Sequence, residues 1–206
     1  MVSVRRRFVS AAVAVAAAGF VLSACGGGQA AGSAAVLGDQ RITTGAVSDA
    51  LTEINEGLGR PANTPNAAAV QSNVQRLIRG NLVDQAADRL AVSVDEGAVD
   101  RELLNTLANA GGQQALDDAL LQSDIPPSAI ADEIRVSLLL GEIGAALAPD
   151  ADQQVRNTLV FEYLVALSNE LDVTVSARFG SWDTAELAVG PIPTDVASPV
   201  SSPLGG

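Results

Sequence analysis

The chain has 206 residues, with 24 acidic residues against 12 arginines, no lysine and a formal net charge of −12. This acidity disfavours nucleic-acid binding, which needs clustered cations, and it gives no attraction to anionic lipid headgroups. The chain has no histidine and one cysteine, Cys25, so Ser-His-Asp and Cys-His catalysis, His-based zinc sites and an internal disulfide are all excluded. Paired carboxylates stay possible on composition, but no catalytic motif accompanies them, and we expect a protein that is not an enzyme.

The first 24 residues have the pattern of an export signal. Three arginines at residues 5–7 precede an uncharged, Ala/Val-rich run at residues 8–22. A positive start, a short apolar stretch and small residues at its end are typical of a secretory signal. The run has about 15 residues and is shorter than the ~20 that a helix needs to span a bilayer. The sequence therefore predicts a signal peptide at residues 1–24.

The end of this signal contains a lipidation motif. Leu22, Ser23, Ala24 and Cys25 resemble a bacterial lipobox, in which the cysteine receives a diacylglycerol and becomes the new N-terminus. Two or three acyl chains, palmitate among them, hold a protein firmly where one chain binds marginally. We expect a lipoprotein on the extracytoplasmic face of the cell membrane, with 9 arginines against 24 acids after cleavage. The alternatives are an ordinary signal with a stray cysteine, or an uncleaved membrane helix.

Residues 25–33 are rich in Gly and Ala and predict a flexible tether between the lipid and a domain. A short strand at residues 34–37 and a turn at Gly38-Asp39 follow. Thr43 or Thr44 can cap a helix that reaches Leu58, where glycines and prolines end it.

A longer helix is predicted from about Asn66 to Leu90. Its apolar residues recur every four positions and form one stripe: Val70, Val74, Ile78, Leu82, Ala86 and Leu90. Ser93 and Glu96 have the spacing of a capping box. They predict a third helix whose inward residues are Val99, Leu103, Leu107 and Ala110.

Three more helices complete the predicted domain. A short one contains Leu116, Leu120 and Leu121, and another runs from Pro126-Pro127 to Leu147 with Ile130, Ile134, Leu138 and Ile143 apolar. Asp150 with Gln153 can cap the last helix, whose stripe is Val160, Leu164, Leu167 and Leu171. Asp150 and Asp152 also suggest a calcium loop, but helix capping explains them better because no glycine or glutamate follows at the required spacing.

The two ends of this domain are predicted to meet. Residues 173–175 are β-branched and strand-like, and Phe179 and Trp182 are expected to pin the terminal strand onto the helices. Residues 184–206 are rich in Pro, Ser and Gly and predict a disordered tail. The expected fold is therefore a mainly α domain at residues 34–183, with a minimal two-stranded sheet formed by its ends.

The order of these segments resembles that of SurA and PrsA type folding factors. AAVLGDQRITTGAVSDAL is similar to their opening strand, turn and helix. QRLIRGNLVDQAADRLAVSVDEGAVDREL is similar to their L-I-x-x-x-L-x-x-x-A-x-x-x-G-(I/V)-x-V-(S/T)-x-x-E-(V/I)-D stretch. GGQQALDDALLQSDIPPSAIADEIRVSLLL is similar to the segment that follows, and RFGSW at residues 178–182 resembles a PrsA-like tail. Here Ala91-Val92 replaces the common Gly-Ile.

The resemblance implies a SurA-like N-terminal chaperone domain that lacks the parvulin prolyl isomerase domain, because only residues 148–151 separate the last two helices. It implies an ATP-independent holdase for unfolded exported polypeptides, with an apolar cleft and no cofactor, metal, nucleic acid or small-molecule substrate. The alternative is a membrane-tethered adaptor for one envelope protein or cell-wall enzyme. Client-binding residues stay unassigned, because buried and client-facing leucines have the same pattern.

Overall fold

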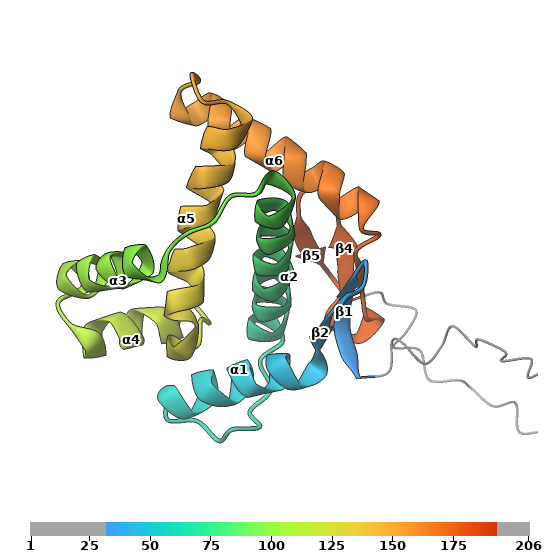
Figure 1. Cartoon of the computed structure of the whole chain (residues 1–206). Helices are drawn as coiled ribbons and strands as arrows, with labels where there is room; N and C mark the ends of the chain where they lie inside the picture. The colour runs from blue at the N-terminus through green and yellow to red at the C-terminus, as the bar shows by residue number, and fades with distance from the viewer. Residues whose placement is uncertain (1–31, 193–206) are drawn as a thin grey trace, which may run out of the picture.

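A computed structural model describes residues 32–192, which form mainly helices (Figure 1). The elements in chain order are β1 (Ser33–Leu37), β2 (Gln40–Thr43), α1 (Thr44–Gly57), α2 (Ala67–Leu90), α3 (Glu96–Ala110), α4 (Gln113–Gln122), η1 (Pro127–Ala129), α5 (Ile130–Leu147), α6 (Gln153–Glu170), β3 (Thr174–Val175), η2 (Ala177–Phe179), β4 (Ser181–Asp183) and β5 (Ala188–Gly190). The predicted mainly α fold is confirmed.

Helix α2 is the centre of the domain. It packs against α5, α6, α1 and β1, and α6 crosses over the ends of α2 and α5 in Figure 1. The predicted stripe is confirmed at its middle, where Val74, Ile78 and Leu82 are fully buried. Val83 and Ala87 are buried as well, because elements cover α2 on more than one side. The core therefore surrounds α2.

Helices α5 and α6 add the second part of the core. In α6 the predicted stripe is buried at Val160, Leu164 and Leu167. Of the apolar positions predicted in α5, Ile134 and Ile143 are buried, and Ile130 and Leu138 are half-buried. Val136 and Leu139, which the prediction did not name, are buried too. The reason is that α5 lies between α2, α6 and α3, so its buried surface is wider than one stripe.

The two ends of the domain meet in a three-stranded antiparallel sheet with the order β2-β1-β3. β1 and β2 are joined by the predicted turn, in which Gly38 has the positive φ of 60° that glycine tolerates. On the other side of β1, Ala35 pairs with Val175, so the predicted pairing of the ends is present. β2 adds a strand that the sequence prediction did not include.

The predicted disordered tail is wrong for residues 184–192. β4 and β5 form a hairpin, in which Trp182 pairs with Val189. The Trp182 indole N–H donates to the Ser168 hydroxyl at 2.8 Å, and the Val189 N–H donates to the Gln75 side-chain oxygen at 3.2 Å. Most of the Pro, Ser and Gly residues that predicted a tail come after residue 192, and distant partners on α2 and α6 order the hairpin. Phe179 is buried, and Phe179 and Trp182 pin the chain end as predicted. Residues 193–206 lie outside the described part of the chain.

Helix starts follow the predicted chemistry, with two corrections. Thr43 caps α1 as expected, its hydroxyl accepting a backbone N–H at 3.0 Å. The capping box at Ser93 is wrong, because Asp95 caps α3. The cap at Asp150 is also wrong, because Asp152 caps α6. In both cases an acid directly before the first helical residue accepts the N–H three positions on.

Helices α3 and α4 form an arm beside α5 (Figure 1). The inward positions predicted for α3, Val99, Leu103, Leu107 and Ala110, are only half-buried, and α3 has no fully buried residue. Leu104 is 66% exposed. The arm therefore contributes little to the core around α2.

Candidate functional site

The predicted lipidation motif stays a prediction, because Leu22, Ser23, Ala24 and Cys25 lie outside the described residues. Of the tether predicted for residues 25–33, residues 25–31 also lie outside the described part of the chain, whereas Ser33 pairs with Thr43 in the sheet. Among residues 32–192, no helix combines the length and the apolar character that crossing a membrane requires.

Within residues 32–192 no three His, Cys, Asp or Glu side chains gather in a way that could hold a metal ion. The carboxylate of Asp152, which the sequence also suggested as part of a calcium loop, accepts the Val155 N–H at 2.9 Å. The capping interpretation therefore holds for Asp152.

Ion pairs join α2 to α5. Arg135 on α5 donates two hydrogen bonds to the Asp84 carboxylate on α2, at 2.6 and 3.2 Å. The hydrogen bond to Asp84 raises the pKa of the Arg135 guanidinium above its ordinary value. Two residues before Arg135 on α5, Glu133 pairs with Arg79 at 2.6 Å and with Arg76 at 3.5 Å. These contacts fix the spacing of the two helices.

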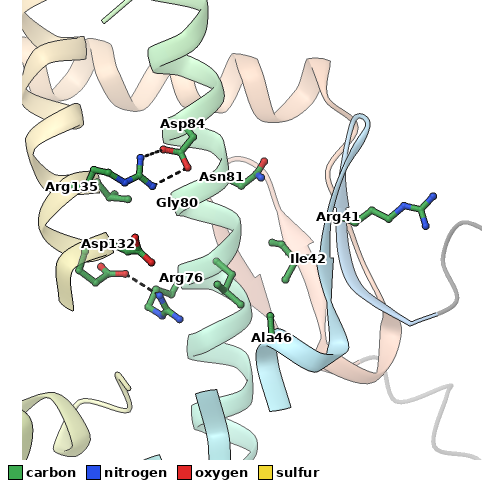
Figure 2. Close-up of a pocket in the computed structure, with 12 residues that line it drawn as sticks. Arg41, Ile42, Ala46, Arg76, Gly80, Asn81, Asp84, Asp132 and Arg135 are labelled. Carbon is green, nitrogen blue, oxygen red and sulfur yellow. Dashed lines mark hydrogen bonds and ion pairs between the residues drawn. The ribbon is translucent and has the colours of Figure 1, made fainter. Parts of the chain in front are cut away.

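A polar hollow of about 250 Å³ lies on one side of this pairing, between β2, α1, α2 and α5 (Figure 2). Figure 2 shows Asp84 and Arg135 meeting across it, while the Arg41 side chain points away. Its charged lining residues are Arg41, Arg76, Asp84, Asp132, Glu133 and Arg135. Three acids and paired arginines make this hollow a poor site for apolar ligands.

An apolar hollow of about 350 Å³ lies where α2, α5, α6 and the β4–β5 turn come together. Phe161 on α6 forms one wall and is 45% exposed, although it is a large aromatic residue. The other lining residues are Arg79, Leu140, Asn157, Val160, Leu164, Glu186 and Leu187. Such a concave apolar surface with a few polar groups at its rim can bind apolar side chains of a ligand.

Sequence reasoning missed this hollow for two reasons. Leu187 lies in the segment predicted as tail, and it reaches the helices only because the β4–β5 hairpin folds back on α2. Phe161 directly follows Val160 and lies outside the predicted stripe of α6. The sequence did contain one indication of the hollow, which is a large aromatic residue, Phe161, next to the buried stripe of α6.

The family model described as SurA-like N-terminal domain matches residues 3–144, which is more than half of the chain. The chain belongs to this family. The SurA-like N-terminal domain is a chaperone-type domain, so a chaperone-like role and polypeptide ligands follow in general terms. The match ends within α5, so Phe161 and Leu187 lie beyond it. No curated protein and no solved structure matches the chain.

Proposed function

We propose that this protein is a lipid-anchored, ATP-independent holdase that binds non-native exported polypeptides in the apolar hollow. The observation that carries the proposal is the half-exposed Phe161 ring, which borders the hollow together with Leu140, Leu164 and Leu187. Apolar surface of this kind normally lies inside a monomer or against a ligand. Unfolded chains are the ligands that expose large apolar side chains to solvent.

The mechanism of this holdase is passive. Burial of apolar surface stabilises a complex by ~25 cal/mol per Å², and association has an entropic cost that leaves only part of this gain. A hollow of about 350 Å³ has room for one or two large side chains. Contacts of this size give weak, reversible binding in the micromolar range or weaker, which lets a client dissociate and fold.

The proposed activity includes no prolyl isomerisation. Residues 148–152 alone connect α5 to α6, and a domain of the parvulin kind does not fit into such a connection. The absence of histidine from the whole sequence also supports a binding role without general base catalysis at neutral pH. A prolyl isomerase assay on the purified protein should therefore give the uncatalysed rate.

The lipid would hold this hollow close to the outer surface of the cell membrane. If the residues between Cys25 and β1 form the predicted flexible tether, about seven residues would span roughly 15 Å. At this distance the hollow can meet polypeptides as they leave the membrane. Because the acidic domain gains nothing from anionic lipids, residence at the membrane depends on Cys25.

Aggregation of chemically unfolded clients tests the holdase. The purified protein, at molar ratios from one to ten, should lower the light scattering of several unrelated clients without ATP. An unchanged scattering curve for every client would refute the holdase. Recovery of one folded partner at fixed stoichiometry, without any effect on aggregation, would instead support the adaptor alternative.

The Cys25→Ala substitution tests the anchor. We expect it to abolish labelling by a radioactive or clickable palmitate analogue and to move the protein out of the membrane fraction or leave it unprocessed. Ser23→Ala is the matched control, because it keeps a small residue in the motif and should be labelled like the wild type. Labelling of the Cys25→Ala protein at the wild-type level would exclude this lipidation site.

A further inference from the structure

Beside the apolar hollow lies another hollow, distinct from the polar hollow of Figure 2, which we call the second hollow. It measures about 290 Å³ and lies between α2, α5 and the segment after α4. Arg79 lines both hollows, so the two are neighbours at this side chain. The lining residues of the second hollow are Ser72, Gln75, Arg76, Arg79, Ser123, Ile125 and Glu133.

Hydrogen-bond donors dominate this second hollow. The Gln75 side-chain oxygen accepts the Val189 N–H at 3.2 Å, so β5 fixes the orientation of the amide. Among the described residues the NH₂ group of Gln75 and the Ser72 hydroxyl donate no hydrogen bond. Both groups are therefore available to a ligand that accepts hydrogen bonds.

The two arginines share one carboxylate. Glu133 pairs closely with Arg79, at 2.6 Å, but only at 3.5 Å with Arg76. The Arg76 side chain is 13% exposed, and its other contact is a hydrogen bond to the Asn73 side-chain oxygen at 3.3 Å. Glu133 is therefore the carboxylate that both arginines share, and Arg76 has the longer and weaker of its two ion pairs.

A second carboxylate would complete this arrangement. Arginine presents five N–H donors in a planar fork that matches a carboxylate, and charge-assisted hydrogen bonds of this kind are the strong ones. Such a contact acts at short range, within the ~8 Å over which salt screens charges at physiological strength. The net charge of −12 opposes acidic ligands at long range, so a preference for them would have to come from these contacts.

We propose that Arg76, Arg79 and the Gln75 NH₂ group form a carboxylate subsite next to the apolar hollow. This inference depends on the proposed function and specifies the client class. The segments held best carry a carboxylate, either an acidic side chain or a free C-terminus, beside a large apolar side chain. In an extended chain every second side chain points to the same face, ~6.6 Å along, so a client can direct an apolar residue and the residue two positions on toward the two hollows.

Four fluorescent peptides test the inference by anisotropy with the purified protein. They share a Leu-Phe pair and differ at the adjacent residue, which is Glu, Gln or Lys with an amidated C-terminus, or Gln with a free C-terminal carboxylate directly after it. We expect the Glu peptide and the free carboxylate to bind about fivefold tighter than the amidated Gln peptide, and the Lys peptide to bind weakest. The Glu and free-acid arms distinguish the two sources of the carboxylate.

Variants assign the preference to the two arginines. Arg76→Met and Arg79→Met should bring the Glu and Gln peptides to equal affinity. Arg89→Met is the matched control, because Arg89 lies on the same helix, pairs with Glu170 and does not line the hollow, so its fivefold ratio should persist. Equal binding of all four peptides to the wild type would overturn the carboxylate subsite and leave the holdase intact. Absence of binding by every peptide would overturn both.

Discussion

The Phe161→Ser substitution measures how much of client binding depends on the apolar hollow. Phe161 stands on α6 with 45% of its surface exposed, and it contributes one wall of the hollow. A serine in this place would remove the aromatic surface and leave α6 intact, since the buried face of the helix is formed by other residues. We expect weaker client binding and a nearly unchanged fold.

The magnitude follows from the exposed area. A phenylalanine buries 150–250 Å² when fully covered, so the exposed 45% corresponds to roughly 90 Å². At ~25 cal/mol per Å², complete coverage by a client stabilises the complex by about 2 kcal/mol, and half coverage by about 1 kcal/mol. The Phe161→Ser protein should therefore bind an apolar peptide about five- to thirtyfold more weakly.

Val155→Ser is the matched control for this measurement. Val155 lies on the same helix and is also 45% exposed, but it does not line the apolar hollow. Anisotropy with a labelled apolar peptide gives the two dissociation constants, and urea unfolding checks that both variants keep the stability of the wild type. Equal weakening by both substitutions would mean that apolar surface in general drives binding. Unchanged binding by Phe161→Ser would place the client elsewhere on the protein.

Three further predictions concern stability, each measured by urea unfolding. Ala91 ends α2 with a positive φ of 52°, where glycine is the favoured residue, so Ala91→Gly should stabilise the domain by about 0.5–1 kcal/mol; a loss of stability would contradict the strain. Gly180 has a φ of 126°, and an added Cβ would stand 2.4 Å from a β5 carbonyl oxygen, so Gly180→Ala should destabilise by about 3 kcal/mol or detach the hairpin. Arg89 lowers the pKa of the Glu170 carboxyl by a hydrogen bond, so this contact stabilises the fold above the ordinary pKa of glutamate and is lost as the pH falls through the lowered value. Glu170→Gln should therefore lower the urea midpoint of unfolding at pH 7 and leave it unchanged near pH 2. An equal decrease at both pH values would exclude this linkage.

Much of the helical architecture could be predicted from local pattern. The spacing of Val74, Ile78 and Leu82 predicts the buried face of α2 because side chains four residues apart lie on one side of a helix. Thr43 predicts the start of α1 because its hydroxyl can satisfy a free N–H of the first turn. Both effects act within a few residues, so they are visible without the tertiary structure.

Competition between nearby candidates limits such predictions. Ser93 and Asp95 can both cap α3, and Asp150 and Asp152 can both cap α6. Which one does so depends on where the chain leaves the preceding element, and that is fixed by packing. In both cases the N-cap is the acid directly before the first helical residue, Asp95 in α3 and Asp152 in α6.

The sequence alone determined that this protein is an acidic, mainly helical domain of the SurA-like kind, because helix periodicity and capping are local properties. Only the tertiary structure decided where the domain is hollow. The apolar hollow joins Leu140, Phe161 and Leu187 from three separate elements, and the subsite beside it depends on a Gln75 amide oriented by β5. Concave surfaces arise between elements, and no local pattern distinguishes a leucine that lines one from a leucine inside the core.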